Sequence, residues 1–536
     1  MAHIKLIYGG PGTGKTHALL NELEKTLASG VRAQEIAYVS FTRQGTYQGV
    51  DLAKEKFDLT EEDCKYFKTL HSLAYHELDV TADKMINRHD LRPIVSKLHL
   101  HSSQFETIDS RLNIAKNKQD TESAHKEAYK GVSLSQAKLT EQVYEEYKKL
   151  LKKLDFADLL LLVKEQRTQI PVKVVFIDEA QDLTKLQWQV VLQFFQNTPQ
   201  WIVAGDPNQS IFEWAGADVP YFLNMRTDEQ VVLEKSYRCS RAVWSMAKAF
   251  YACITEKAPI PDKGTDEEGF AIVQPKEELN PAVLFAMAKK GSLMCLAIQN
   301  TYLDRYIACC VTYGIPYAIK SKGVVKPCIK PQTLRFIKKL YRTLTNSEYY
   351  TQYITNNATC GRQQSRADRA FKEKLREEKV LEWAVLPVEE RIPRLIDYIK
   401  AKTHKPDEQA FLIRSVLSGN IDIADDYVLI TNIHQVKGAE SDYVMLCDNV
   451  ASIYCNQADN DVSYKDYLLR VFYVGVTRAR YGVCIWHRDV YNTIAPTAVF
   501  TNIGTFQSIE PSISAYAEDY IKENYIKEQS NENNQV

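Results

Sequence analysis

One stretch near the N-terminus, residues 9–16 with the sequence GGPGTGKT, limits what this chain can fold into more than any other. It follows the apolar run Ile4–Tyr8 and precedes the helix-forming run His17–Leu20, so the order is strand, glycine-rich loop, helix. In that order, backbone N–H groups can close on phosphate oxygens, and the helix N-terminus adds its dipole. The sequence therefore predicts an α/β nucleotide-binding domain.

The residues of this loop have separate expected tasks. We expect Lys15 to reach the β- and γ-phosphates and the Thr16 hydroxyl to bind Mg²⁺. The remaining members of the predicted phosphate cradle are Gly9, Gly10, Pro11, Gly12, Thr13 and Gly14.

A pair of carboxylates follows the apolar run Val172–Ile177, which is typical of a buried parallel strand. Acidic residues at such a strand end lie where open α/β sheets place their ligand crevice. One alternative is that Asp178 and Glu179 only cap the next helix. Together with a phosphate loop, they are better interpreted as the Mg²⁺-binding carboxylate, Asp178, and the general base for the attacking water, Glu179.

A second strand-like run, Trp201–Ala204, leads into the polar stretch Gly205–Trp214. A turn needs Gly, Asp, Pro and Asn, but it does not need Gln209, Phe212 and Trp214. Aromatic side chains beside a nucleotide site suit stacking on unpaired bases. The alternative, that both aromatic residues belong to the hydrophobic core, stays open from the sequence alone.

At 536 residues the chain is too long for one hydrophobic core, and about 150 residues per domain gives three or four domains. Apolar runs at Phe270–Val273, Leu293–Ile298, Tyr427–Ile433, Tyr443–Cys447 and Val483–Trp486 predict a second α/β sheet. Two polar, helical stretches interrupt the two sheets. The expected parts are a first α/β domain (1–75 and 155–235) with a helical insertion (76–154), a second α/β domain (236–344 and 416–500) with a helical insertion (345–415), and a C-terminal helix with a disordered polar tail (501–536).

The charge of the chain limits what its overall field can do. The net charge is −1, so any site for a polyanion must come from a local arrangement. Between Ala318 and Arg342 there are eight Lys or Arg residues and no Asp or Glu. Such a run is either a solvated face or a contact to a phosphate backbone, and the sequence leaves both readings open.

The eleven cysteines include no C-x₂-C pair, which favours reduced, buried thiols in a cytosolic protein. No stretch approaches ~18 uninterrupted apolar residues, and the N-terminus leads directly into the first strand without a signal peptide. We therefore expect a cytoplasmic protein.

Taken in order, the motifs resemble those of the UvrD/Rep/PcrA type of superfamily 1 DNA helicase. Phe41-Thr42 looks like the family's first contact to single-stranded DNA, and Thr69–Ser72, with His71, looks like its second. Asp155–Leu160 is similar to the segment that leaves the first insertion. The stretch Gly205–Ala217 is a close match to the motif that couples the γ-phosphate to DNA. By this resemblance Gln209 senses the phosphate and Trp214 stacks on a base, while Phe212 stands where the family usually has Tyr.

The second half of the chain carries further matching motifs. Leu233–Arg238 resembles the motif whose tyrosine, here Tyr237, stacks on adenine and whose arginine, here Arg238, touches the γ-phosphate. Ile433–Glu440 looks like the motif that touches DNA, here with His434, and the nucleotide, here with Glu440. Tyr473–Arg480 is nearly the family form of the last motif, with Arg478 in the arginine-finger position.

This resemblance implies two RecA-like domains with ATP and Mg²⁺ in the cleft between them, each carrying a helical insertion, and Arg238 and Arg478 supplied by the second domain. It implies a 3′ to 5′ helicase acting on single-stranded, tailed or forked DNA in replication, repair or recombination, alongside proteins of those processes. The chain is short for the family, as in a compact phage or mobile-element version. The resemblance also implies a place in the cytoplasm of a bacterial or phage-infected cell, in association with the nucleoid. Three alternatives remain: a translocase that strips proteins without unwinding, a nucleotide-switched binding module, and an RNA substrate.

Overall fold

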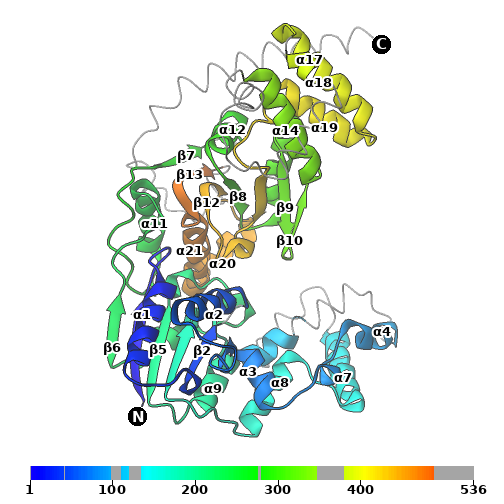
Figure 1. The fold of residues 1–536 in the computed structure, drawn as a ribbon. Helices are drawn as coiled ribbons and strands as arrows, with labels where there is room; N and C mark the ends of the chain where they lie inside the picture. The colour runs from blue at the N-terminus through cyan, green and yellow to red at the C-terminus, as the bar shows by residue number, and fades with distance from the viewer. Residues whose placement is uncertain are drawn as a thin grey trace. The chain divides into compact units, whose positions relative to one another are not determined.

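The computed structural model describes residues 2–40, 43–97, 110, 112–119, 134–275, 279–346, 380–384 and 386–487 (Figure 1). Two compact units divide the chain. Unit 1 comprises residues 1–238 and 254–265, and unit 2 comprises residues 239–253 and 266–536. Among the described residues, every helix is too short or too polar to cross a bilayer.

Unit 1 is built on a six-stranded sheet in which every strand pair is parallel. Its strand order is β3-β2-β4-β5-β1-β6. The strands are β1 (His3–Tyr8), β2 (Ile36–Ser40), β3 (Phe67–Thr69), β4 (Val174–Asp178), β5 (Gln200–Gly205) and β6 (Glu229–Val232). The helices are α1 (Lys15–Ala28), α2 (Arg43–Phe57), α3 (Leu70–Glu77), α4 (Arg88–Lys97), α7 (Leu134–Leu151), α8 (Phe156–Glu165), α9 (Lys185–Phe194) and α10 (Val219–Leu223).

Both faces of this sheet are buried, because successive strand residues enter two different apolar clusters. Ile7 and Phe176 pack with α1 and α2, whereas their neighbours Leu6 and Val175 pack with α3, α8 and α9. A strand with both faces buried has no polar alternation, which explains the continuous apolar runs in the sequence. The strand predicted at Val172–Ile177 begins two residues later and includes Asp178 as its last residue.

Unit 2 contains a seven-stranded mixed sheet in the order β10-β9-β11-β8-β12-β13-β7, in which only the edge pair β9–β10 is antiparallel. The strands are β7 (Phe270–Pro275), β8 (Leu293–Ala297), β9 (Tyr317–Ser321), β10 (Val324–Pro327), β11 (Val428–Asn432), β12 (Ser441–Cys447) and β13 (Ala479–His487). The helices are α11 (Arg241–Cys253), α12 (Pro281–Lys290), α13 (Asn300–Tyr313), α14 (Pro331–Thr345), α17 (Val380–Ala384), α18 (Val388–Lys402), α19 (Pro406–Leu417), α20 (Ser452–Asn460) and α21 (Val462–Val476).

The predicted fold class, α/β with two sheet-based domains and helical insertions, is confirmed. The helical part of unit 2 has its own apolar cluster, to which α14 contributes Leu334 and Leu340 beside Leu395 of α18 and Leu412 of α19. Because α14 shares this cluster, helical packing begins near Ile329 instead of at residue 345. The segment proposed as a C-terminal helix and tail, 501–536, lies outside the described residues.

Candidate functional site

The glycine-rich loop connects β1 to α1 and is held in a tight turn. The Thr13 hydroxyl donates to the Gly10 carbonyl (2.9 Å), and the Lys15 ammonium donates to the Gly9 carbonyl (2.9 Å). Gly14 caps the helix in the left-handed region, at φ +78°. The loop thus places Lys15 and Thr16 in the first turn of α1, where helix N–H groups have no partner within the helix.

Gly12 is the loop residue that tolerates a side chain least. Its φ of +68° is in the left-handed region, and an added Cβ would lie 2.3 Å from Cβ of Arg238. The close approach arises because the Tyr237 amide donates to the Gly12 carbonyl (2.8 Å) and the Ser236 hydroxyl donates to the Pro11 carbonyl (2.7 Å).

Tyr237 and Arg238 therefore lie against the phosphate loop within unit 1. From the sequence we expected the second domain to begin at residue 236. In the structure, residues 236–238 belong to unit 1, and hydrogen bonds connect them to the phosphate loop. Tyr237 is 72 % exposed, and the Lys235 ammonium lies 5.9 Å from the centroid of its ring, so most of the ring remains accessible.

Asp178 ends β4 and is fully enclosed by donors and neighbours. Its Oδ2 accepts from the Tyr38 hydroxyl (3.0 Å), and its Oδ1 accepts from the Glu179 amide (2.9 Å). Burial and the adjacent Glu179 carboxylate raise the pKa of Asp178 to about 6, against the opposing effect of the Lys15 charge. A buried carboxylate whose negative charge is disfavoured in this way suits a site that binds a cation.

A chain of hydrogen bonds connects Glu179 to Gln209. The side-chain Nε2 of Gln181 donates to Glu179 Oε2 (2.5 Å), and the side-chain Oε1 of Gln181 accepts from the backbone amide of Asp206 (2.9 Å). Asp206 Oδ2 in turn accepts from the Gln209 side chain (2.6 Å). Gln181, Asp206 and Gln209 are buried. We therefore expect that a movement of the Glu179 side chain would change the hydrogen bonds of Gln209, at the other end of the series.

The aromatic pair after this chain is only partly buried. Phe212 and Trp214 meet edge to face, with ring centroids 6.5 Å apart. Trp214 is 50 % exposed, so the alternative that it is a core residue is wrong. Phe212 is half-buried.

The predicted nucleic-acid residues that can be described are uncharged at neutral pH. Burial lowers the pKa of His71 to about 4, and its ring meets the edge of Phe156. Burial, and then the charge of Lys437, lowers the pKa of His434 to about 4. The His434 ring also stacks on Tyr467, and its Nε2 lies 2.9 Å from the Tyr467 hydroxyl. The predicted DNA contacts of both histidines stay predictions, and their pKa values exclude a role as cations at neutral pH. Phe41 and Thr42 lie outside the described residues.

Arg478 and Glu440 belong to unit 2. The Arg478 side chain is buried and donates to the carbonyls of Val474 (3.1 Å) and Ala439 (3.1 Å). Glu440 forms an ion pair with Arg480. Neither residue is placed relative to the phosphate loop of unit 1, so their predicted roles stay predictions.

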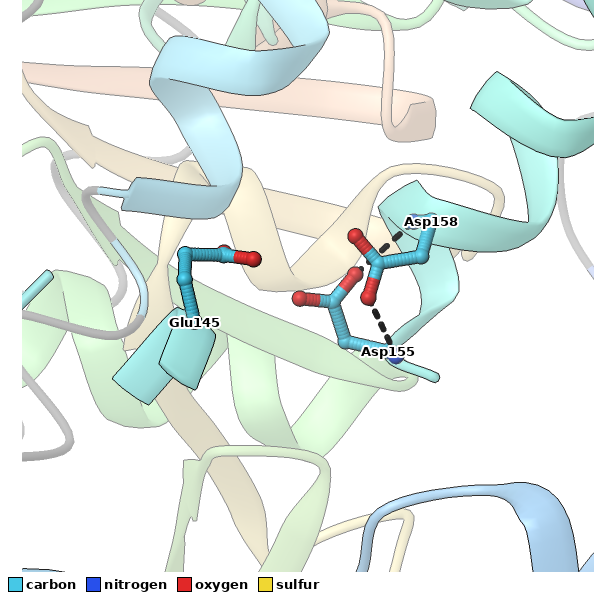
Figure 2. A group of neighbouring side chains, drawn as sticks. All are labelled: Glu145, Asp155 and Asp158. Carbon is cyan, nitrogen blue, oxygen red and sulfur yellow. Dashed lines mark hydrogen bonds between the residues drawn. The ribbon is translucent and has the colours of Figure 1, made fainter. Parts of the chain in front are cut away.

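One further acidic group, Glu145, Asp155 and Asp158, brings three carboxylates within reach of one another (Figure 2). Lysine ammonium groups already occupy it. Lys148 lies 2.6 Å from both aspartates, and Lys116 lies 2.7 Å from Glu145. We call these five residues the Asp155 ion-pair cluster. It connects α7 of the insertion to the start of α8, where Asp155 and Asp158 also cap each other's amides.

Sequence reasoning missed Tyr38, Gln181 and Asp206. Tyr38 is the clearest case, since its partner is 140 residues away and is reached through the pairing of β2 with β4. The signal that could have found it is the phenol hydroxyl in the middle of β2, a strand whose only other polar residue is Ser40 at its end.

Comparison with known proteins gives a consistent result. Residues 2–230 match the family described as UvrD/REP helicase N-terminal domain. The chain is 24 % identical over 286 residues to the ATP-dependent DNA helicase PcrA of Staphylococcus epidermidis, covering 47 % of this chain and 38 % of the relative. It is 26 % identical over 269 residues to PcrA of Bacillus subtilis, covering 44 % and 36 %. The aligned part of the chain thus spans little more than a third of these relatives, and the similarity to the UvrD/REP helicase N-terminal domain covers residues 2–230.

Proposed function

We propose that this chain is an ATP-dependent DNA helicase that moves 3′ to 5′ along single-stranded DNA and separates duplex strands. The hydrogen-bond chain from Glu179 through Gln181 and Asp206 to Gln209 supports this most, because it runs from the candidate catalytic base toward Phe212 and Trp214. Through such a series of hydrogen bonds, a change from bound ATP to bound ADP would alter the positions of the side chains that stack on bases.

The predicted site residues of the two units have separate proposed roles in ATP hydrolysis. Lys15 and the loop amides would bind the phosphates, and Glu179 would take the proton of the attacking water. The oxygen donors Thr16 and Asp178 suit Mg²⁺, which prefers hydroxyl and carboxylate oxygens. Bound there, Mg²⁺ would neutralise phosphate charge. Tyr237 would stack on adenine, and Arg238, Arg478 and Glu440 would contact the nucleotide.

The DNA contacts would come from uncharged groups. Trp214 and Phe212 would stack on bases, and His71 and His434 would add neutral contacts, with Phe41 and Thr42 as further expected contacts. Replication or recombination proteins are proposed partners.

Strand separation with ATP and Mg²⁺ tests this function on two duplexes, one with a 3′ tail and one with a 5′ tail. We expect opening of the 3′-tailed duplex alone. Opening of neither, with DNA-stimulated hydrolysis intact, would instead support the translocase. An RNA-tailed duplex opened better than the DNA one would change the substrate class.

The stacking role has its own test. We expect Trp214→Ala to keep basal ATP hydrolysis and to lose most of its stimulation by single-stranded DNA, since base stacking contributes about 1–3 kcal/mol. Leu150→Ala is a matched control, because Leu150 is 77 % exposed on the surface of the same unit. Equal stimulation of both variants would refute stacking by Trp214.

A further inference from the structure

The basic run between Ala318 and Arg342 separates into two parts with different environments. On α14, Arg335 pairs with Asp426 (2.5 Å) and Arg342 pairs with Asp422 (2.6 Å). Lys338 donates to the Asp425 carbonyl (2.8 Å). The segment 422–426 therefore neutralises much of the α14 charge, and this part of the run serves the fold of unit 2.

The other part forms the β9–β10 hairpin. Lys320 and Lys326 lie on its strands, and Lys322 lies in its turn. Within the described part of the chain, none of these three lysines has a carboxylate at ion-pair distance. Lys322 and Lys326 are exposed, as are the neighbouring Val324 (55 %) and Val325 (41 %).

The hairpin has a defined shape and is not a loose loop. Lys322 (φ +50°) and Gly323 (φ +77°) form a two-residue turn with both residues in the left-handed region, which matches the twist of paired strands. β10 is the edge strand of the unit 2 sheet and lies beside β9 (Figure 1). β9 joins the hairpin to β11.

This pairing places the hairpin beside the segment that carries His434. Ile319 pairs with Ile430, and the Thr431 hydroxyl donates to the Lys320 carbonyl (2.9 Å). At the turn, the Gly323 amide lies 3.5 Å from Oε1 of Gln435, the residue after His434. The hairpin beside this uncharged proposed DNA contact thus carries three unneutralised cations: Lys322 at its turn, and Lys320 and Lys326 on its two opposite faces, because Lys320 pairs with Val325 and Lys326 with Ile319.

We propose that the β9–β10 hairpin is a second nucleic-acid contact, in which Lys320, Lys322 and Lys326 bind phosphates of the strand that His434 touches. The charges suit a phosphate backbone, and the exposed valines offer apolar surface to sugars and bases. This rests on the proposed function. A competing explanation is that the lysines only protect an exposed edge strand from pairing with other chains.

The test compares the variant K320Q/K322Q/K326Q with K289Q/K290Q/K400Q, which removes the same charge from other exposed positions of unit 2. Binding of a fluorescent single-stranded oligonucleotide is measured by anisotropy at several salt concentrations. We expect the hairpin variant to bind about tenfold more weakly and the slope of log K against log salt to fall by about 2, at ~0.7 per phosphate contact. The control should match wild type, and DNA-free ATP hydrolysis should be unchanged in both.

Several outcomes would overturn the hairpin contact. One is an unchanged affinity and slope, and another is aggregation with an unchanged slope, which would favour edge protection. If the triple variant does not fold, K322Q alone should lower the slope by about 0.7. If wild type binds no nucleic acid, the proposed function fails. If wild type binds and the hairpin variant binds equally, the hairpin contact alone fails.

Discussion

The connection that follows a central strand differs sharply between the two units. In unit 1, six residues, Gly9–Gly14, lie between β1 and α1, and Gly12 and Gly14 adopt left-handed conformations. In unit 2, only Ile298 and Gln299 lie between β8 and α13. A two-residue connection cannot surround a phosphate group with backbone amides. Similar sheets can therefore support different tasks: on our account, unit 1 binds phosphate and unit 2 adds charge for the transition state.

The helical parts of the two units differ in a second way. Around α14, α18 and α19 in unit 2, the contacts come from an apolar cluster that includes Leu395. In unit 1, α7 packs on α4 through a smaller apolar cluster that includes Ile94 and Tyr144, but it meets α8 through the Asp155 ion-pair cluster. Apolar burial does not depend on pH, but a buried network of carboxylates and ammonium groups does. The two helical parts should therefore respond differently to acid.

The largest effect is expected for Arg478, and it tests whether unit 2 supplies charge to the transition state. Arg478→Ala should lower ATP turnover by about 10³, because an arginine finger stabilises charge that develops in the transition state, while ATP affinity stays within about tenfold of wild type. Turnover and nucleotide binding are measured separately. Thr477→Val is the control for local packing, since the Thr477 hydroxyl bonds to two carbonyls of α21. Equal losses in both variants would mean that Arg478 only braces the helix.

The next effect sharpens the comparison of the helical parts. Lys148→Met leaves buried carboxylates uncompensated and should lower the free energy of unfolding by about 3 kcal/mol at pH 7. Although burial opposes it, the charges of Lys116 and Lys148 lower the pKa of Asp155 to about 2. In wild type this stabilisation is complete above the unfolded-state pKa near 4 and is lost as the pH falls toward 2.

In the variant, burial of Asp155 is no longer opposed by the Lys148 charge, so the pKa of this carboxyl rises and the carboxyl takes up a proton at a higher pH than in wild type. The loss caused by Lys148→Met should therefore be smaller at pH 4 than at pH 7, as measured by chemical unfolding. Leu395→Ala in unit 2 is the matched comparison, and it should cost about 3 kcal/mol at both pH values. A pH-independent loss for Lys148→Met would show that the lysine contributes by packing and not by charge.

A smaller effect concerns the residue that supports Asp178. Tyr38→Phe removes one donor from Oδ2, a net loss of about 1 kcal/mol. We expect the Mg²⁺ concentration for half-maximal hydrolysis to rise about fivefold. The pKa of Asp178 should rise above about 6, which moves the acid limb of the pH profile upward. Tyr306→Phe, which also loses a buried hydroxyl, should lower stability alone. A Tyr38→Phe profile that matches wild type would contradict the supporting role.

The sequence predicted the features that depend on residues close together in the chain. The phosphate loop, Asp178 and Glu179 each sit at the end of an apolar strand, and the structure places them there. What sequence could not give was long-range register. Tyr38 reaches Asp178 only because β2 pairs with β4. The basic run near α14 looked uniform because the aspartates that neutralise part of it lie about 80–90 residues downstream.

ATP hydrolysis by wild type and Lys15→Ala, each with and without single-stranded DNA, tests the central claim most directly. The account predicts hydrolysis by wild type that DNA stimulates, and loss of at least about 100-fold in Lys15→Ala with an unchanged unfolding midpoint. Lys25→Ala, on the exposed side of the same helix, should match wild type. Hydrolysis that DNA does not affect, or that survives in a folded Lys15→Ala variant, would contradict the account.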